Sequence, residues 1–387
     1  MVTEAVKGFR DIEGASAERK IQIRNIIEQM FRVYGFQAVE TPIIEQEEFV
    51  KGNNSSDEAV SEIFKLSDRG ERKLALRYEF TFQLKRLAQN KKLPYKRYQV
   101  GEVFRDEPTT GNRWRQFTQC DADIIGSSVK DEAEILKIAT DILEKLGLEF
   151  TININNRKLL NEILEKAGVR EKDRIDVIRE IDKLDKLSEK EVRENLKKYN
   201  AEKVLDIFNK KEKEFEKYEF YKEIKALKDS CKLYGLEVNF LPTLARGLSY
   251  YNSSVFEVKT REMKETITAG GSYLVNGIQS TGISFGLDRL EVLSKIKEDK
   301  KEKLIIISLD QDKKAIELAQ EFRNKNIFCV VMYGKPSRAL EYANSYGIDS
   351  VIFIGEEEVK KKKFKLKNMK TGKEEMLSEK EIVKKFT

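Results

Sequence analysis

Histidine is absent from the chain of 387 residues. This absence excludes catalysis by Ser-His-Asp or Cys-His groups, metal sites with imidazole ligands, and proton shuttles that use an imidazole side chain. Any chemistry must therefore use carboxylates, arginines, tyrosines or the substrate itself.

Cysteine is also scarce. Cys120, Cys231 and Cys329 lie far apart in the sequence and form no CxxC pair. An odd number of scattered cysteines indicates neither a disulfide framework nor a thiolate zinc site. We therefore expect three buried free thiols and no metal held by histidine or cysteine.

Apolar runs long enough to cross a bilayer are missing, and the N-terminal residues 1–14 lack the charged-then-apolar layout of a signal peptide. We expect a cytoplasmic protein without a membrane partner. The net charge of +6, from 73 basic and 67 acidic residues, permits binding to nucleic acid but does not demonstrate it.

The first part of the chain has the pattern of an α+β domain. Apolar residues at Ile23, Ile27 and Met30 predict an amphipathic helix within 18–35. Pro42 confines the next segment, 36–45, to an edge, a strand end or an interface. An antiparallel sheet flanked by helices is predicted by further strand-like segments at 73–80, 98–106, 115–126, 149–155, 253–260 and 266–275.

Two changes of pattern mark the other parts. Residues 157–234 are charged and helical, which we interpret as an insertion between two sections of the first domain, 1–156 and 235–298. After a charged linker at 296–303, short apolar runs alternate with helical patterns, which is the layout of βαβ units. A separate α/β domain is therefore predicted at 303–387.

Arginines gather around the turn of a predicted hairpin at 103–126. Arg105, Arg113 and Arg115 are spaced so that several guanidinium groups can point to one place, which suits phosphate better than a single carboxylate. For one hairpin alone, a solvated face is the ordinary alternative. Arg289 follows a strand punctuated by glycines that would allow a ligand to approach the backbone closely.

These segments resemble a known family. FRDEPTTGNRWRQF resembles motif 2, GISFGLDRL motif 3, and YGFQAVETPIIE motif 1 of class II aminoacyl-tRNA synthetases. LARGLSYYNSSVFEV and AGGSYL are similar to the two signature stretches of histidyl-tRNA synthetases, and QCDADIIG and NNRKLL resemble members of archaeal and eukaryotic type. The resemblance covers nearly the whole chain, so 1–156 and 235–298 would form a catalytic domain and 303–387 an anticodon-binding domain.

The resemblance implies activation of histidine by ATP and Mg²⁺, with ligands for the magnesium unknown, followed by transfer to tRNA(His). It assigns catalysis to Arg105, which would grip the α-phosphate, and to Arg246, which would approach it from the opposite side. Phe117 and Arg289 would sandwich the adenine. The ATP-binding residues implied are Arg105, Arg113, Arg115, Phe117 and Arg289.

The resemblance also implies a pocket for histidine. Glu79 and Thr81 alternate on one strand face and would accept from the ammonium group, together with Gln119. Asp123 and Tyr251 match the positions that bind the imidazole; we prefer Asp123 to Asp121 because it shares strand parity with Gln119. The residues implied are Glu79, Thr81, Gln119, Asp123, Arg246, Tyr250, Tyr251 and Tyr273.

Ordinary structural roles remain open for several of these side chains. The tyrosines are also compatible with plain strand aromatics, Glu79 with a surface charge, and the two aspartates with structural pairing. The sequence departs from the family at Ser249, Ser272 and Leu274, which stand where acidic, Arg and Asp residues are usual. We expect these changes to remove charge near the histidine pocket.

Without a protein imidazole, we expect a nonbridging phosphate oxygen of the adenylate to act as the base in transfer, with no protein group titrating near pH ~6.5. Related enzymes are generally homodimers with motif 1 at the interface. Residues 360–373 contain eight lysines and no acid, which suits either a contact with RNA or a solvated hairpin.

Three other functions compete with this interpretation. A non-catalytic paralogue that binds histidine as a regulatory subunit of histidine biosynthesis typically lacks the C-terminal domain. A sensor of uncharged tRNA would carry a kinase segment, which we do not find. A synthetase for another amino acid is opposed by RGLSYY and Asp123.

Overall fold

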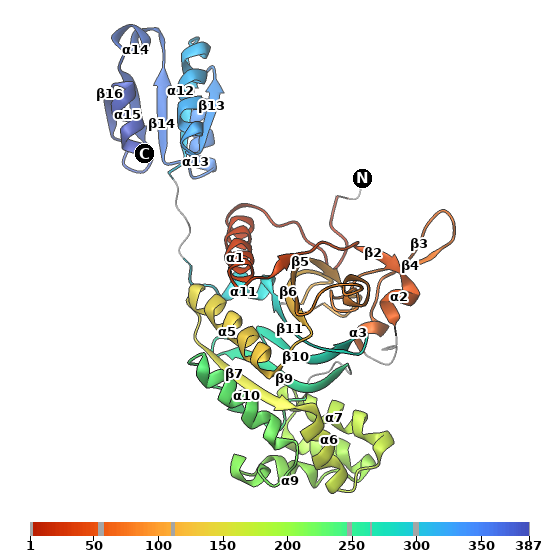
Figure 1. Cartoon of the computed structure of the whole chain (residues 1–387). Coiled ribbons are helices and arrows are strands. Elements are labelled where there is room, and N and C mark those ends of the chain that lie inside the picture. Colours follow the sequence, from red (N-terminus) through yellow and green to blue (C-terminus); the bar gives the residue numbers. More distant parts are fainter. Residues whose placement is uncertain are drawn as a thin grey trace. The chain divides into compact units, whose positions relative to one another are not determined.

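The computed structural model describes residues 3–52, 58–109, 113–245, 250–263, 265–296 and 302–386. The chain divides into two compact units, Met1–Ile296 and Lys297–Thr387 (Figure 1).

An eight-stranded sheet forms the centre of the first unit. Its six middle strands are antiparallel, and a short strand pairs in parallel at each edge. The predicted antiparallel sheet is thereby confirmed. In spatial order the strands are β1 (Gln37–Ala38), β5 (Tyr95–Phe104), β6 (Gln116–Ile125), β11 (Ile278–Gly286), β10 (Thr268–Val275), β9 (Tyr251–Thr260), β7 (Phe150–Asn156) and β8 (Asn239–Phe240).

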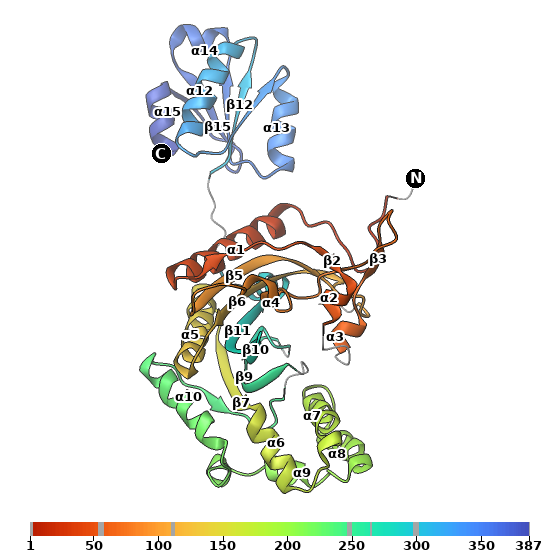
Figure 2. The ribbon, with the colours of Figure 1, turned by 45° about the vertical axis from the view of Figure 1, so that its right-hand side comes forward.

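Helices cover one face of this sheet. The amphipathic helix α1 (Gly14–Val33) buries Ile23, Ile27 and Phe31, and it packs with α5 (Val129–Lys145) and α11 (Leu287–Leu293). On β6 the even-numbered residues Cys120 and Ala122 join this core. Since side chains alternate along a strand, the odd-numbered residues face the other side, where α4 (Leu84–Leu87) lies (Figure 2).

Pro42 divides a segment that the sequence suggested as one strand. The chain forms β1 before it and β2 (Ile44–Gln46) after it, because proline has no N–H to donate to a ladder. β2 joins a small separate sheet of order β2-β4-β3, with β3 (Lys65–Ser67) and β4 (Lys73–Leu76), beside α2 (Glu47–Lys51) and α3 (Glu58–Ser61).

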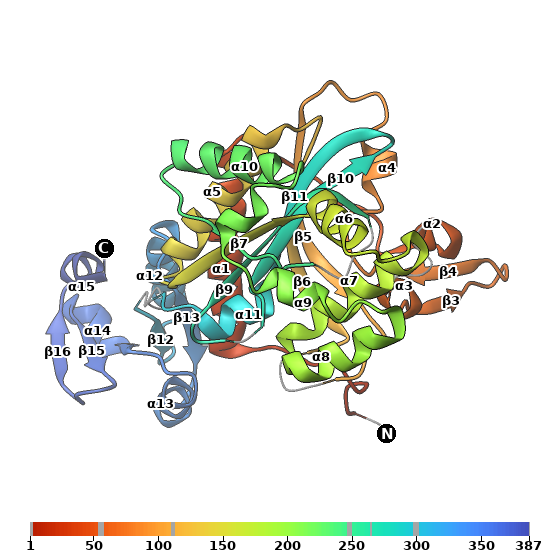
Figure 3. The same cartoon turned by 90° about the horizontal axis from the view of Figure 1, so that it is seen from below.

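The segment between β7 and β8 is helical, as predicted (Figure 3). α10 packs on α5, and its residues Ile224 and Leu227 belong to the same core as the sheet. An ion pair of 2.7 Å between Asp185 and Lys259 ties a turn of the insertion to β9. The helices are α6 (Arg157–Lys166), α7 (Arg174–Asp182), α8 (Glu189–Leu196), α9 (Val204–Phe208) and α10 (Tyr221–Leu233), with short 3-10 turns at Glu171–Asp173, Lys183–Asp185, Lys197–Tyr199 and Glu212–Phe215.

The second unit is an α/β domain with a five-stranded sheet of order β13-β12-β14-β15-β16. The first three strands in this order are parallel, as the alternating pattern predicted, and the last two are antiparallel. Its elements are β12 (Leu304–Ser308), α12 (Asp312–Asn324), β13 (Cys329–Tyr333), α13 (Pro336–Ser345), β14 (Ser350–Ile354), α14 (Glu356–Lys361), β15 (Phe364–Asn368), β16 (Glu374–Leu377) and α15 (Glu379–Phe386).

Two absences noted in the sequence can be compared with the fold. Cys120, Cys231 and Cys329 are buried and free, as predicted. Across the described residues, no helix has the length and apolar character needed to span a membrane.

Candidate active site

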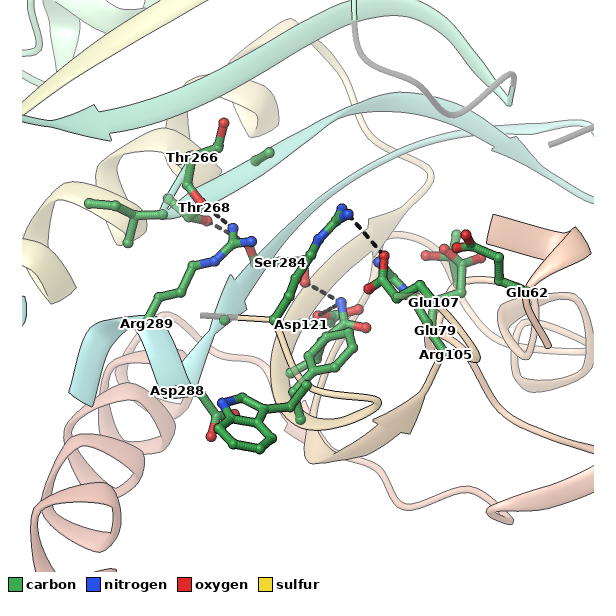
Figure 4. A pocket seen from close by; sticks show the side chains of 18 of the residues that line it. Glu62, Glu79, Arg105, Glu107, Asp121, Thr266, Thr268, Ser284, Asp288 and Arg289 are labelled. Atoms are coloured by element: carbon green, nitrogen blue, oxygen red, sulfur yellow. Dashed lines mark hydrogen bonds and ion pairs between the residues drawn. The ribbon is translucent and has the colours of Figure 1, made fainter. Parts of the chain in front are cut away.

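A cavity of about 360 Å³ opens on the sheet face that α1 and α5 leave uncovered. Glu62, Glu79, Arg105 and Glu107 gather at one end, and Thr266, Thr268 and Arg289 lie at the other, with Asp121 and Ser284 between them (Figure 4). The further lining residues are Thr81, Arg113, Trp114, Phe117, Gln119, Lys186, Tyr250, Tyr251, Ile267, Ala269, Gly286 and Asp288.

Strand register explains why residues distant in sequence meet here. Across β5, β6 and β11, Gln99 pairs with Asp121, which pairs with Ser284. Two residues away on each strand, Arg97, Asp123 and Gly282 form a second row beside the first. The inner face of the sheet is therefore a grid of polar side chains and glycines.

The arginine end derives from the predicted hairpin. The Nε of Arg105 donates to the Tyr78 carbonyl at 3.2 Å, and its guanidinium lies 5.1 Å from the centre of the Phe117 ring. Arg113 lines the cavity and pairs with Glu107 at 3.1 Å. These contacts hold cationic groups at one end of the cavity before any ligand is present.

Arg115 does not line this cavity. Its Nε donates to the Glu107 carbonyl, its guanidinium pairs with Asp106 at 3.1 Å, and its backbone N–H donates to the Gly8 carbonyl. The contacts of Arg115 therefore fasten the N-terminal segment to the hairpin.

Motif 3 supplies the other end. Arg289 donates to the Thr266 carbonyl at 2.7 Å, which fixes its guanidinium over the cavity. The neighbouring Asp288 accepts from the Thr118 backbone at 2.9 Å and pairs with Lys20 at 3.0 Å. Asp288 thus joins α11 to β6 and to α1.

Polar acceptors and tyrosines line the wall between these ends. Glu79, Thr81 and Gln119 all face the cavity, and Gln119 donates to the Ser284 hydroxyl at 2.6 Å. Tyr250 and Tyr251 lie there too, with ring centres 4.8 Å apart. One cavity is therefore lined by residues from both the ATP-binding set and the histidine-binding set suggested from the sequence.

Asp123 and Tyr273 lie behind this wall. Both are buried, and the Tyr273 hydroxyl donates to the Asp123 carboxylate. Asp123 also forms an ion pair of 2.7 Å with the fully buried Arg97. Tyr273 packs edge-on against Tyr250, which does line the cavity, at 5.5 Å between ring centres.

Asp121 lines the cavity, although sequence reasoning preferred Asp123 for the pocket. Strand parity does not separate the two aspartates, because both stand at odd positions with Gln119. Burial raises the pKa of Asp121 to about 7, with a further contribution from the Asp123 carboxylate against the opposing charge of Arg97.

Other lining residues had no signal in the sequence. Glu62 and Lys186 come from loops or turns far from the motifs, and Lys186 belongs to the helical insertion. Trp114 lies in motif 2 and Asp288 in motif 3, so their place in the cavity could have been predicted from these motifs. Arg246 lies outside the described residues, as does Ser249.

The remaining departures from the family pattern can be located. The Ser272 side chain is buried on the far face of β10, where it hydrogen-bonds Glu132 of α5. It therefore lies away from the cavity, and the expectation that this change alters charge beside the pocket is wrong for Ser272. Leu274 is half exposed and does not line the cavity.

No cluster of three or more acidic or cysteine side chains suitable for a metal occurs among the residues that the structure describes. A magnesium ion that arrives with ATP takes most of its ligands from phosphate and water and needs only one or two carboxylates. Glu62 and Glu107, at the arginine end, are of the right type.

An antiparallel sheet that gathers motifs 2 and 3 around one polar cavity defines a class II aminoacyl-tRNA synthetase fold. Solved structures agree with this class. A histidyl-tRNA synthetase from Nostoc sp. PCC 7120 has a TM-score of 0.83 at 22% identity, with 100% of this chain and 99% of that chain covered. A chain described as an ATP phosphoribosyltransferase regulatory subunit/histidyl-tRNA synthetase from Bacillus halodurans C has a TM-score of 0.77 at 22% identity, with 91% and 98% covered.

Sequence comparison specifies the family. The histidyl-tRNA synthetase model matches residues 8–290, and an anticodon binding domain model matches 303–387. Histidine–tRNA ligase 2 of Shouchella clausii is 32% identical, over 96% of this chain and 97% of its own length. The histidine–tRNA ligase of Helicobacter pylori is 33% identical over 96% and 95%. The chain belongs to the histidyl-tRNA synthetase family.

Proposed function

We propose that the chain is a histidine–tRNA ligase. It activates L-histidine with ATP to histidyl-adenylate and pyrophosphate, and then transfers histidine to the 3′ end of tRNA(His). The observation that carries this proposal is the cavity itself, where Arg105, Phe117 and Arg289 share one space with Glu79 and Gln119. Family membership over nearly the full length supports it.

In the activation step, the histidine carboxylate attacks the α-phosphorus, the new C–O–P linkage forms and the bond to pyrophosphate breaks. Charge develops on the α-phosphate oxygens, and Arg105 is placed to stabilise it, with Arg246 as a second cation. Phe117 and Arg289 bind the adenine between them. Arg113 neutralises the outer phosphates.

Histidine is bound by its two polar ends. Glu79, Thr81 and Gln119 accept from the ammonium group. Tyr251 in the cavity wall and the hydrogen-bonded Asp123–Tyr273 pair directly behind that wall recognise the imidazole. Arg115 would serve ATP binding only indirectly, because its contacts hold the N-terminal segment against motif 2.

Magnesium supplies charge neutralisation on the phosphates when ATP is bound. Glu62 and Glu107 are the residues that would hold it, and Glu107 is also the ion-pair partner of Arg113.

Transfer requires a base for the ribose hydroxyl. We retain a nonbridging phosphate oxygen in this role, because the chain has no imidazole. The cavity does contain Asp121, whose pKa is about 7. A pH dependence near 7 is therefore to be tested against an Asp121 variant before it is assigned to the substrate.

Two further parts of the proposal concern assembly. Residues 303–387 bind the anticodon of tRNA(His). The chain forms a homodimer through motif 1, for which the exposed apolar side chains Ile43, Ile44 and Leu66, on or beside the small sheet, are suited. Sedimentation analysis measures the dimer directly.

The first experiment is ATP–pyrophosphate exchange with magnesium and each of the twenty amino acids in turn. Exchange with histidine alone supports the proposal, and charging of tRNA(His) completes it. A folded protein that binds histidine without exchange would instead be the regulatory paralogue. That alternative is less favoured because the chain carries the anticodon-binding domain.

A further inference from the structure

Arg97 is among the largest side chains that are fully buried in the described part of the molecule. It lies on β5, in the row of the sheet that contains Asp123 and Gly282. An arginine stays charged in a protein interior, and burying it is costly unless it is paired and hydrogen-bonded. Its position therefore calls for a specific explanation.

Among the described residues, one nitrogen of this guanidinium makes both polar contacts of Arg97. Nη2 lies 2.7 Å from a carboxylate oxygen of Asp123 and donates to the Phe80 carbonyl at 3.2 Å. Nε and Nη1 have no hydrogen-bond partner among the described residues. A group placed only for stability would be expected to use more of its five donors.

The two partners of Arg97 belong to the two halves of the amino-acid pocket. Phe80 lies between Glu79 and Thr81, which line the cavity. Asp123 accepts from Tyr273, which packs against Tyr250 in the cavity wall. Arg97 thus connects the segment proposed to bind the ammonium group with the carboxylate proposed to bind the imidazole.

The charge of Arg97 also supports a link to Asp123. Burial raises the pKa of Asp123, and the positive charge of Arg97 opposes that rise, together with the hydrogen bond from Tyr273. Without Arg97, the buried carboxyl group would have only the tyrosine to keep it ionised, and it would take up a proton at higher pH.

We propose that Arg97 is a positioning residue for histidine recognition, which holds the Asp123 carboxylate and the Phe80 carbonyl at a fixed separation behind the cavity. The inference rests on the proposed function. Arg97 does not touch the substrate; it acts through Asp123 and through the backbone that carries Glu79 and Thr81.

The test compares Arg97→Met with a matched control, Arg77→Met. Arg77 is also buried, and it donates to the carbonyls of Glu102 and Thr41. Histidine affinity is measured by calorimetry, and KM for histidine and for ATP by pyrophosphate exchange. We expect Arg97→Met to raise the histidine Kd and KM about ten- to a hundred-fold, with KM for ATP little changed. Arg77→Met should lower the melting temperature without this selectivity.

Two more variants separate positioning from simple stability. Arg97→Lys keeps the charge and should restore part of the histidine affinity. Arg97→Met combined with Asp123→Asn removes both charges, so it should fold even if the single variant does not, yet its histidine affinity should stay low.

A histidine affinity equal to wild type in the double variant would overturn the proposal. So would an equal rise of both KM values in Arg97→Met, or the same histidine defect in Arg77→Met. Wild-type protein is measured first: if it neither binds histidine nor supports exchange, the proposed function fails and this inference fails with it. If wild type behaves as proposed, only the Arg97 role is at stake.

Discussion

At the scale of single residues, Arg105 is fixed before any substrate binds. Its guanidinium is held by the Tyr78 carbonyl and lies against the Phe117 ring. Such preorganisation stabilises charge that develops in the transition state without a cost of reorientation at that moment.

Replacing Arg105 by glutamine should therefore lower the rate of histidine-dependent exchange by about a hundred- to a thousand-fold. Stability should change little, because the side chain is only half-buried. Steady-state pyrophosphate exchange measures the rate, and a melting curve measures the stability. A variant with normal exchange would contradict the role given to Arg105.

Asp121 gives a second prediction, for stability against pH. Its pKa is raised from 3.8 to about 7 in the folded state, mainly by burial. Between these values the folded protein binds a proton that the unfolded chain has released, so stability falls as pH rises from about 4 to 7. The absence of histidine leaves few other groups that titrate in this range.

Asp121→Asn should accordingly lose less stability than wild type between pH 4 and 7 in denaturant unfolding. Asp229→Asn on the exposed side of α10 is the control and should follow the wild-type curve. If Asp121→Asn and wild type have parallel pH profiles, the carboxyl group does not titrate as described.

The sequence alone could not decide which of the aspartates on β6, Asp121 or Asp123, lines the cavity. Alternation on β6 correctly predicts that Gln119 and Asp123 share a face, but it assigns Asp121 to that face as well. Which of the two aspartates reaches the cavity depends on Arg97 and Tyr273, which come from other strands. Only the sheet register brings them together.

At the scale of elements, glycines make room for the row that contains Asp123. A Cβ on Gly282 of β11 would lie 2.2 Å from the Asp123 carboxylate and 2.9 Å from the Tyr273 hydroxyl. Because both groups are held by hydrogen bonds or ion pairs, they have little freedom to move aside.

Gly282→Ala should therefore destabilise the fold by about 1–3 kcal/mol and weaken histidine binding. At Gly286 on the same strand, the added Cβ meets only the Arg289 side chain at 3.8 Å. Gly286→Ala should change stability by no more than about 0.5 kcal/mol. Unfolding curves of the two variants, measured side by side, give both changes in the free energy of unfolding. Equal decreases in the two variants would contradict the steric argument.

Most elements were predictable from local pattern, and the exceptions have local causes. Alternation located the strands of the large sheet, and the apolar spacing of α1 located its buried face. The split at Pro42 was only partly foreseen. The strand predicted at 73–80 is shorter than expected and belongs to the small sheet with β2, not to the large sheet, because alternation locates a strand but not its partners. The contribution of Lys186 to the cavity depends on how the insertion folds back, which no local pattern encodes.

At the scale of the whole molecule, charge is more balanced than the sequence suggests. The lysines of 360–373 lie at the end of α14, on β15 and in the turns that flank β15, which pairs with β16 in a hairpin. Six of the eight are paired with acids outside that stretch, for example Lys365 and Lys367 with Glu374. This local neutralisation favours the solvated hairpin over a dedicated RNA contact.

The two units also have separate hydrophobic cores. Among the described residues, the apolar clusters of the first unit extend to Ile296, and those of the second begin at Leu304. Because each unit buries its own apolar residues, each is expected to fold without the other.

Removing the C-terminal unit separates the two steps of the proposed reaction. The cavity and the residues assigned to ATP and histidine lie within Met1–Ile296. The fragment 1–296 should therefore melt cooperatively and keep histidine-dependent pyrophosphate exchange within about threefold of the full chain, since it retains the preorganised site. Charging of tRNA(His) should fall much further, because contacts with the phosphate backbone and the anticodon are lost.

Adding the separate domain 303–387 in trans should not restore charging, since the gain from covalent linkage is lost. A folded fragment that charges tRNA(His) as well as the full chain would show that the C-terminal domain does not contribute to tRNA binding, while loss of exchange from a folded fragment would show that the active site depends on it.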